Sequence, residues 1–307
     1  MYLISELLGE YLSDKVLKGT SQRSYSVACR ALIRQAGDCL VEQVDRKTIL
    51  QWRKDALGIS LKPVSWNSYV RHLRGLLQFG IDRGLVGLVD NPFAGCHVRP
   101  TRRPCKTVEQ KNVARARHLL TDMEQEEIEW GQQAVLHPAW FWRVVFETFA
   151  YTGLRANELI CLRMCDIDLH KWLICVTADV SKNYEERKVP IHNSLHEHLV
   201  KLVRIAKKRK IRDDQQLFNV NMFSMRHRKE FMDMDQVSAF YKRLSKLLGQ
   251  RLSAHRFRHT IATELMRFPD RNIHTVKELL GHRNIATTMK YITVDHRQMR
   301  ELLNSFA

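Results

Sequence analysis

Paired cysteines, long apolar runs and acidic side chains are all scarce in this 307-residue chain. Its seven cysteines are scattered and form no Cys-x-x-Cys pair, which argues against a disulfide framework and a zinc ribbon and indicates reduced thiols. No run approaches the ~18 apolar residues of a membrane span, and the first residues lack the pattern of a signal peptide. We therefore expect a cytoplasmic protein with no membrane partner.

The shortage of acidic residues leaves a large positive charge. Fifty Lys and Arg against 33 Asp and Glu give +17, which is typical of a protein that follows a phosphate backbone. Charge alone does not separate a DNA partner from RNA or an anionic membrane. The positive charge is densest over residues 101–120, which hold six basic side chains and one acidic side chain.

The length suits two domains. Helical periodicity without strand patterns predicts a small helical domain over residues 1–95. Pro92 and Gly95, followed by residues 99–104 (RPTRRP), break this periodicity, so we expect an exposed basic linker over residues 96–120. The helices expected in the first domain cover residues 3–12, 21–35, a segment capped by Asp45, and 63–83.

Residues 121–307 are expected to form a second domain with a mixed pattern. Thr121 followed by Glu124 predicts the capped start of a helix, and residues 138–151 predict an apolar helix. Strands are expected only within 164–191, and helices and loops after Ser194. The fold class is therefore mainly α with a small β-sheet, an α+β arrangement.

Residues with catalytic potential concentrate in the last 150 positions. Three runs hold most of them: Thr152 to Leu159 (TGLRANEL), His255 to His259 (HRFRH), and Leu279 to His282 (LLGH), which is followed by Tyr291. Each residue alone has a common structural explanation, such as a packed tyrosine or a solvated turn lysine. Their joint order carries the information, and the candidate catalytic residues are Arg155, Lys182, His255, Arg258, His282 and Tyr291.

This set can cleave a phosphodiester through a covalent intermediate, which needs a nucleophile, donors for the phosphate oxygens and an acid for the leaving oxygen. Tyr291 can be the nucleophile and store the bond energy as a phosphotyrosine. Arg155 and Arg258 suit the developing charge because guanidinium stays protonated and binds two oxygens. Lys182, at an expected hairpin turn, can protonate the leaving oxygen.

Two further residues are expected to support the site. Glu158 lies three positions after Arg155, the spacing that lets it orient that arginine on a helix. His259 ends the HRFRH run. We expect no metal or other cofactor, because the neighbouring His192, His196 and His198 have no carboxylate or cysteine to complete a ligand set.

These motifs resemble those of the tyrosine recombinases, also called the lambda-integrase family. Members share an Arg in a Thr-Gly-Leu-Arg-x-x-Glu-Leu run, a hairpin Lys, a His-x-x-Arg, a His or Trp after Leu-Gly, and a C-terminal Tyr. The resemblance covers residues 121–307, and residues 187–191 (RKVPI) look like the strand that follows the family's hairpin lysine. Two segments depart from the family pattern: the hairpin reads Ser181-Lys182-Asn183 in place of Gly-Lys-Gly, and residues 268–271 replace a glycine turn.

The resemblance implies a site-specific DNA recombinase. Tyr291 would form a 3′-phosphotyrosyl enzyme with a free 5′-hydroxyl, and strand exchange would give integration, excision, inversion or resolution. The two arginines would stabilise the transition state, Lys182 would be the general acid, His255 would assist proton transfer from the tyrosine, and His282 would bind the phosphate. The implied partners are double-stranded DNA with specific sites and a homo-tetramer, with no small-molecule substrate.

A compact enzyme of a mobile genetic element, without an arm-binding domain and associated with a bacterial nucleoid, fits this resemblance. Residues 1–95 resemble the family's core-binding domain only in size and helical content, and with the second domain they could clamp duplex DNA. Residues 296–306 are expected to form a short amphipathic helix that packs on its own domain or on a neighbouring protomer, and the resemblance implies its exchange within a tetramer. Candidate phosphate contacts are Arg71, Arg74, Arg102, Arg103 and Lys106, although Arg71 and Arg74 are equally consistent with a solvated helix face.

Two other functions remain open at this stage. A type IB topoisomerase uses similar phosphotyrosine chemistry but relaxes supercoils without strand exchange. A DNA-binding regulator could keep the fold without catalysis, which the retention of all six catalytic residue types argues against.

Overall fold

The computed structural model describes residues 1–101, 106–178, 186–226, 229–267, 272–291, 300 and 303–305. The chain divides into two compact units, Met1–Arg103 and Pro104–Ala307. Both are mainly helical, and the described strands form a single three-stranded sheet in the second unit. The expected fold class is confirmed.

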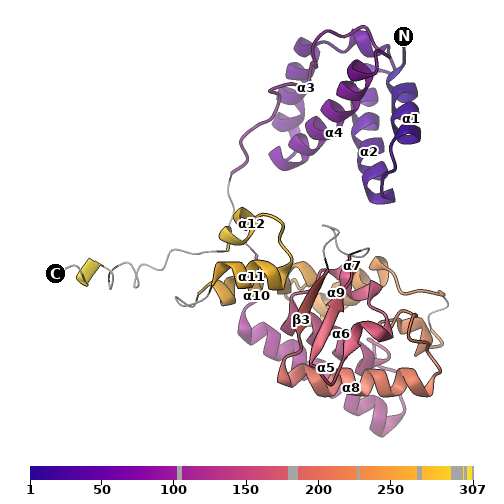
Figure 1. The fold of residues 1–307 in the computed structure, drawn as a ribbon, viewed down its shortest axis with the longest axis vertical. Helices are drawn as coiled ribbons and strands as arrows, with labels where there is room; N and C mark the ends of the chain where they lie inside the picture. The colour runs from indigo at the N-terminus through magenta and orange to yellow at the C-terminus, as the bar shows by residue number, and fades with distance from the viewer. Residues whose placement is uncertain are drawn as a thin grey trace. The chain divides into compact units, whose positions relative to one another are not determined.

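The first unit is a bundle of four helices: α1 (Ile4–Asp14), α2 (Gly19–Ala36), α3 (Arg46–Ile59) and α4 (Pro63–Asp82). Figure 1 shows them side by side, with α4 in contact with the other three. The expected helices are confirmed, including the cap at Asp45, whose side chain accepts a hydrogen bond of 2.6 Å from the amide of Thr48.

The segment after α4 is attached to the first unit. The Trp66 indole is fully buried and donates to the carbonyl of Cys96 at 2.8 Å. Asn67 accepts from the amide of Val98 and donates to its carbonyl, at 2.9 and 2.7 Å. Residues 96–98, expected in an exposed linker, are therefore bonded to α4 because these side chains satisfy their backbone groups.

The core of the second unit is built around α6 (Ala139–Thr152), which contacts α5 (Gln110–Trp130), α8 (Asn193–Lys208) and α10 (Ala254–Met266). The side chains of Phe141, Phe146 and Phe149 are fully buried. Burying each such side chain stabilises the fold by roughly 1.5–3 kcal/mol. Because α6 is apolar on most of its surface, it takes the central position in this unit.

The expected helix start at Thr121 is wrong. The helix α5 begins at Gln110, and Thr121 lies within it, where its hydroxyl donates to the carbonyl of Arg117 at 2.9 Å. Glu124 has no capping role, since it forms ion pairs with Arg143 and Lys201. The helix extends further because buried Val113, Ala116 and Leu120 pack into the core, so residues 110–120 of the expected linker are helical.

The sheet has the order β1-β2-β3, with both pairs antiparallel. Its strands are β1 (Ile167–Asp168), β2 (Leu173–Val176) and β3 (Arg187–Pro190), and Ile174 pairs with Val189. The strands expected within 164–191 are confirmed. Lys182, for which a hairpin turn was expected, lies outside the described residues.

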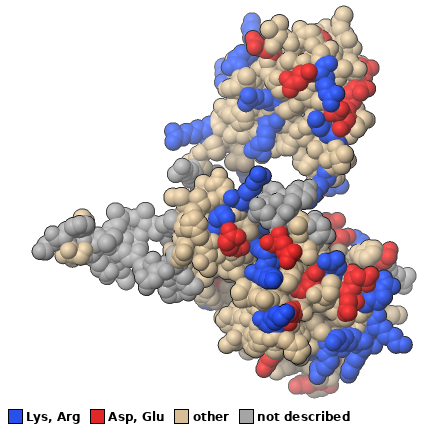
Figure 2. Space-filling model, viewed as in Figure 1, with Lys and Arg blue, Asp and Glu red and all other residues tan. Residues whose placement is uncertain are grey.

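Four further α-helices complete the described part of the second unit: α7 (Ala156–Cys161), α9 (Met234–Leu248), α11 (Ile273–Leu280) and α12 (Ile285–Met289). Figure 1 shows α10, α11 and α12 together, and α11 also contacts β3. Lys and Arg side chains are exposed on both units and are interspersed with acidic ones on the face drawn in Figure 2. No helix in the described part of the chain is long and apolar enough to cross a membrane.

Candidate active site

Among the described helices of the second unit, α6 and α11 end at glycines with left-handed backbone, as α5 and α9 also do. Gly153 ends α6 at φ 63°, and Gly281 ends α11 at φ 61°. Glycine suits these positions because other residues are strained at such φ values. The last carbonyls of a helix have no partner within it, and here they accept hydrogen bonds from arginines. The Thr-Gly-Leu-Arg and Leu-Gly-His runs are therefore two helix ends facing one site.

Arg258 connects these two ends. One Nη donates to the carbonyl of Gly153 at 2.9 Å and the other to the carbonyl of Leu280. The side chain is only 4% exposed. Burial and the charge of Arg155 lower the pKa of Arg258 to about 10, so it remains protonated at neutral pH. A guanidinium has five N–H donors, so these contacts leave others for an anionic ligand.

Arg155 and Arg187 share one carboxylate. Arg155, the N-cap of α7, donates from Nη1 to Glu158 Oε1 at 2.6 Å and from Nη2 to the carbonyl of Gly281 at 2.8 Å. Arg187 on β3 donates to both Glu158 oxygens, at 3.0 and 2.6 Å. Glu158 thus bonds Arg155, the residue that it was expected to orient, and it also bonds a second arginine.

The buried carboxylate is held in its charged form. Burial raises the pKa of the Glu158 carboxyl, but hydrogen bonds and charge from Arg187, followed by those from Arg155, outweigh burial and hold that pKa below its usual range. Arg187 also donates to the carbonyl of Leu279 at 3.3 Å. It thus joins β3, the start of α7 and the end of α11. Three guanidiniums gather here, and Glu158, which pairs with Arg155 and Arg187, is the one carboxylate in an ion pair with any of them in the described part of the chain.

Tyr291 lies beside His282 at the end of α12. Their rings are nearly parallel, at 7°, with centroids 6.0 Å apart, and both residues are 6% exposed. Fully buried Thr288 connects them, since its hydroxyl pairs with His282 Nδ1 at 2.9 Å and its carbonyl accepts from the amide of Tyr291 at 3.0 Å. Burial, then the charges of Arg258 and Arg155, lower the pKa of His282 to about 4. The His282 ring is therefore neutral at pH 7.

The two histidines of α10 contact each other. His259 Nε2 lies 2.7 Å from His255 Nε2, and the His259 ring centroid lies 5.3 Å from that of Tyr291. Burial lowers the pKa of both rings, that of His259 to about 4 with further contributions from His255 and Arg258. His255 is exposed, whereas His259 is half-buried.

The structure brings five of the six candidate residues together: Arg155, His255, Arg258, His282 and Tyr291. The sixth, Lys182, lies outside the described residues. Sequence reasoning gave no role to Arg187 or Thr288. Arg187 stood in a strand pattern after the hairpin, but its partner Glu158 is 29 positions away. Thr288 lies between His282 and Tyr291 in sequence, and only the fold shows that it bonds both.

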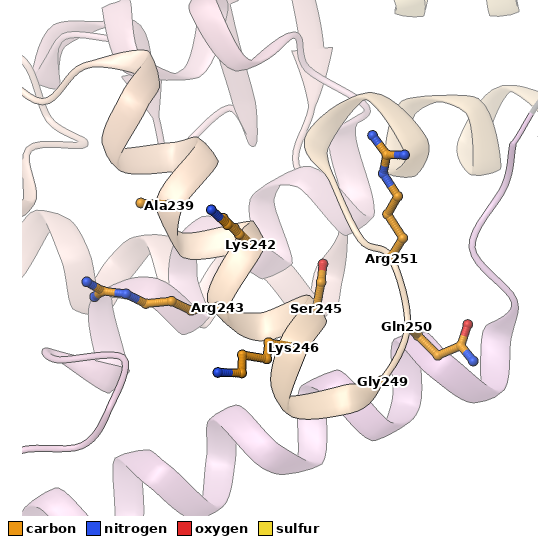
Figure 3. Close-up of a pocket in the computed structure, with 8 residues that line it drawn as sticks. All are labelled: Ala239, Lys242, Arg243, Ser245, Lys246, Gly249, Gln250 and Arg251. Carbon is orange, nitrogen blue, oxygen red and sulfur yellow. The ribbon is translucent and has the colours of Figure 1, made fainter.

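A hollow of about 630 Å³ lies beside α9. Figure 3 shows Lys242, Arg243 and Lys246 extending from this helix and Arg251 from the loop after it. A second hollow of about 440 Å³ shares Lys242 and Arg251 and reaches His255. Exposed cations therefore line a path that leads from the catalytic candidates along α9. We call these four cations the α9 basic track.

The three neighbouring histidines have aromatic and structural contacts. His192 stacks on Tyr151 with centroids 4.4 Å apart, and His196 stacks on Trp172 at 4.0 Å. His198 is buried enough for desolvation to lower its pKa. Among the described residues, no group of three or more His, Cys, Asp or Glu is placed to hold a metal ion.

Among structures of known proteins, the fold is similar to that of the Tn1549 transposon integrase in complex with a circular intermediate DNA. The TM-score is 0.74 at 17% identity, covering 99% of this chain and 100% of that chain. It is also similar to a lambda integrase dimer bound to a COC' core site, with a TM-score of 0.70 at 18% identity and 97% of each chain covered. At these identities the likeness concerns the fold.

Sequence comparison gives nearer relatives. The chain is 43% identical to a putative tyrosine recombinase XerC of Pseudomonas syringae over 98% of this chain and 63% of that protein. It is 42% identical to a putative tyrosine recombinase XerC of Pseudomonas aeruginosa over 98% of this chain and 71% of that protein. The pattern of the phage integrase family matches residues 124–298, more than half of the chain. This chain belongs to the phage integrase family, the family of the tyrosine recombinases.

Proposed function

We propose that the chain is a site-specific DNA recombinase that cleaves and rejoins DNA through a 3′-phosphotyrosyl intermediate. The observation that carries this proposal is the cluster of Arg155, Arg187 and Arg258 next to Tyr291, in which a single carboxylate, that of Glu158, pairs with Arg155 and Arg187. Such a cluster keeps excess positive charge where a phosphate would bind. Family membership and the relatives' names point to the same activity.

In the proposed reaction the Tyr291 phenol oxygen attacks the scissile phosphorus. The bond to the 5′-oxygen breaks, and that oxygen takes a proton, for which Lys182 is the candidate donor. Arg155 and Arg258 stabilise the negative charge on the non-bridging oxygens, because their forks are already oriented by backbone carbonyls and Glu158. His282, neutral at pH 7, donates a hydrogen bond to the phosphate from Nε2 while Nδ1 faces Thr288.

The orientation of these groups before the substrate arrives matters for rate. Oriented donors cost no reorganisation during the reaction, and each is worth roughly 10²–10³ in rate. Arg187 contributes indirectly, because it holds Glu158 and the end of α11. We assign it a positioning role rather than direct contact with the phosphate.

Covalent capture tests this function and reveals the DNA site. Nicked duplexes of randomised sequence are incubated with the full chain, and complexes that survive denaturation in SDS are sequenced. We expect covalent complexes on a defined sequence, which disappear in Tyr291→Phe. Complexes that persist in Tyr291→Phe, or their complete absence with the unmodified chain, would overturn the proposal.

The products of a plasmid assay distinguish a recombinase from a topoisomerase. A plasmid with two copies of the captured site should yield recombinant junctions. Relaxation of supercoils without junctions would favour a type IB topoisomerase instead. DNA binding with neither product would favour a regulator that has kept the fold.

We further propose that the α9 basic track contacts the phosphate backbone beside the scissile position. Its four cations are exposed, and no ion pair joins them to another described residue. Each phosphate contact adds about 0.9 to the slope of log affinity against log salt. Replacing Lys242, Lys246 and Arg251 by Gln should therefore reduce the slope by about 2.7 in DNA-binding titrations.

A control with the same charge change sharpens this measurement. Lys207, Lys208 and Arg209 are exposed at the end of α8, and their triple replacement by Gln should leave the slope nearer its original value. Equal losses in the two variants would show that net charge, rather than the α9 basic track, sets the affinity.

The candidate contacts from the sequence fall into two groups. Arg71 and Arg74 are exposed on α4, and Lys106 is exposed before α5. Arg102 and Arg103 lie outside the described residues. We keep Arg71, Arg74 and Lys106 as proposed contacts with double-stranded DNA, to be tested by the same salt titration.

Assembly as a homo-tetramer on paired sites is also a proposal. Of the apolar positions expected in a C-terminal helix, Leu303 is described and is 71% exposed, which is consistent with a contact made to another protomer. Deletion of residues 297–307 should reduce cooperative assembly on DNA in gel-shift experiments. Unchanged cooperativity would contradict the exchange of this segment.

A further inference from the structure

His259 occupies a position between two candidate catalytic residues. It lies one helical turn after His255 on α10, with the two Nε2 atoms 2.7 Å apart. Its ring also lies against Tyr291, with centroids 5.3 Å apart and planes tilted by 46°. The other ring nitrogen, Nδ1, is buried and has no hydrogen-bond partner. A buried polar atom without a partner is unusual and indicates a function or a missing ligand.

The short contact between the two rings determines where the protons lie. Both rings are neutral at pH 7, since burial lowers their pKa values and nearby Arg258 lowers them further. Two neutral imidazoles share one N–H, so one Nε2 donates and the other accepts. If His259 Nε2 accepted, its Nδ1 would carry an unsatisfied buried N–H, at a cost of about 1–3 kcal/mol. The favoured arrangement has His259 Nε2 donating to His255 Nε2.

This arrangement leaves the Nδ1 of His259 with a free lone pair. The atom is shielded from solvent and belongs to a ring that contacts the candidate nucleophile. The charged groups around it are Arg258, and beyond it Arg155 and Arg187, while His255, His282 and Tyr291 are its titratable neighbours. No carboxylate pairs with the His259 ring among the described residues. A proton that arrived at Nδ1 would therefore not remain on His259 as a second buried positive charge.

We propose that His259 is a catalytic residue that relays the phenolic proton of Tyr291 to His255, an inference that rests on the function proposed above. As the tyrosine oxygen attacks phosphorus, its O–H bond breaks and an N–H bond forms at His259 Nδ1. At the same time the proton on His259 Nε2 passes to His255 Nε2. His259 stays neutral with its proton moved to Nδ1, and His255 becomes the cation. Rejoining of the strand reverses these transfers.

The relay places the charge where solvent can stabilise it. His255 is exposed, whereas His259 is half-buried with its Nδ1 shielded from solvent, so the cation forms on the ring that has more contact with water. A direct transfer to His259 alone would create an imidazolium beside buried Arg258. Desolvation and like charge both oppose that outcome. Two histidines one turn apart can thus accept the phenolic proton without placing a positive charge on the half-buried ring of His259.

Proton counting in cleavage tests the relay without any substitution. Single-turnover cleavage of the captured nicked site is measured in mixtures of H₂O and D₂O, on a site with sulfur in place of the 5′-bridging oxygen. A thiolate leaves without needing a proton, so only nucleophile activation contributes. We expect a plot of the cleavage rate against the deuterium fraction to be curved, because two protons are transferred. A linear dependence in the unmodified chain would overturn the relay.

Variants give an independent result on the same substrate. His259→Gln should lower the cleavage rate by about 10²-fold, and this loss should persist on the sulfur-containing site. The cleavage rate of this variant should vary linearly with the deuterium fraction. The cleavage rate of Lys182→Ala should instead be restored on the sulfur-containing site, because the proposed role of Lys182 is to protonate the leaving group. His274→Gln, at an exposed position of α11, serves as the matched control and should cleave at the original rate.

The outcomes separate the relay from the underlying function. Should the unmodified chain form no covalent complex that depends on Tyr291, the proposed function fails. If that complex forms but His259→Gln cleaves as fast as His274→Gln, only the relay fails. Recovery of His259→Gln on the sulfur-containing site would place His259 on the leaving-group side and would also contradict the relay. DNA binding and circular dichroism of each variant establish that it is folded.

Discussion

Replacing Glu158 by Gln should damage both stability and cleavage. Glu158 is 1% exposed and accepts four hydrogen bonds, from the amide and Nη1 of Arg155 and from both Nη atoms of Arg187. Glutamine removes the negative charge and turns a donor toward the guanidiniums. Breaking a buried ion pair by removing one partner costs about 3–5 kcal/mol. Loss of a fixed arginine position should slow cleavage by about 10²-fold.

The pH dependence follows from the lowered pKa of Glu158. Because the folded protein binds this proton less readily than the unfolded chain, the stabilisation is fully present above the unfolded pKa of about 4.3. It is lost as pH falls from that value through the folded pKa. The difference in unfolding free energy between the unmodified chain and Glu158→Gln should therefore be largest near pH 7 and shrink below about pH 4.

The chain provides a matched control in Glu147, which is also 1% exposed. It accepts two hydrogen bonds from Arg117, at 2.7 and 2.8 Å, and has no contact with the arginine cluster. Urea unfolding followed by circular dichroism should show a loss for both Glu147→Gln and Glu158→Gln. Single-turnover cleavage per folded molecule should fall only in Glu158→Gln. Equal cleavage by the two variants would refute the positioning role of Glu158.

Three further substitutions test the site. In Gly281→Ala the new Cβ would lie 2.8 Å from Arg187 Nη1, at a φ of 61°. Its urea midpoint should therefore indicate a loss of unfolding free energy above ~1 kcal/mol. The control Gly84→Ala, also at positive φ but in open space, should lose less. Arg258→Lys should cleave about 10²–10³-fold more slowly, since one amine cannot reach the carbonyls of both Gly153 and Leu280. Arg256→Lys serves as the control, and equal cleavage rates in the two variants would contradict this expectation. His282 should titrate near pH 4 by NMR, and its stabilising contribution should be lost as pH falls from about 6.5 toward that value; a midpoint near 6.5 would show that the ring is not desolvated.

The sequence determined the local features of this protein. Asp45, Gly153 and Gly281 mark helix ends by their own backbone and side-chain chemistry, so the elements could be predicted without knowledge of their surroundings. The motifs are also short local runs in a fixed order, so the sequence alone was enough to indicate the family. The predicted helix start at Thr121 was wrong, because packing of α5 against α6 lets the helix begin earlier, at Gln110.

Only the tertiary structure decided how the site is held together. Arg187 meets Glu158 across 29 positions, and Arg155 meets the carbonyl of Gly281 across 126. The contact of His259 with Tyr291 depends on how α10 and α12 are placed around α11. Hydrogen bonds between distant segments follow from the packing of whole elements, which no local pattern encodes. The residues that can do the chemistry were therefore evident from the sequence, whereas their orientation, burial and protonation were set by the fold.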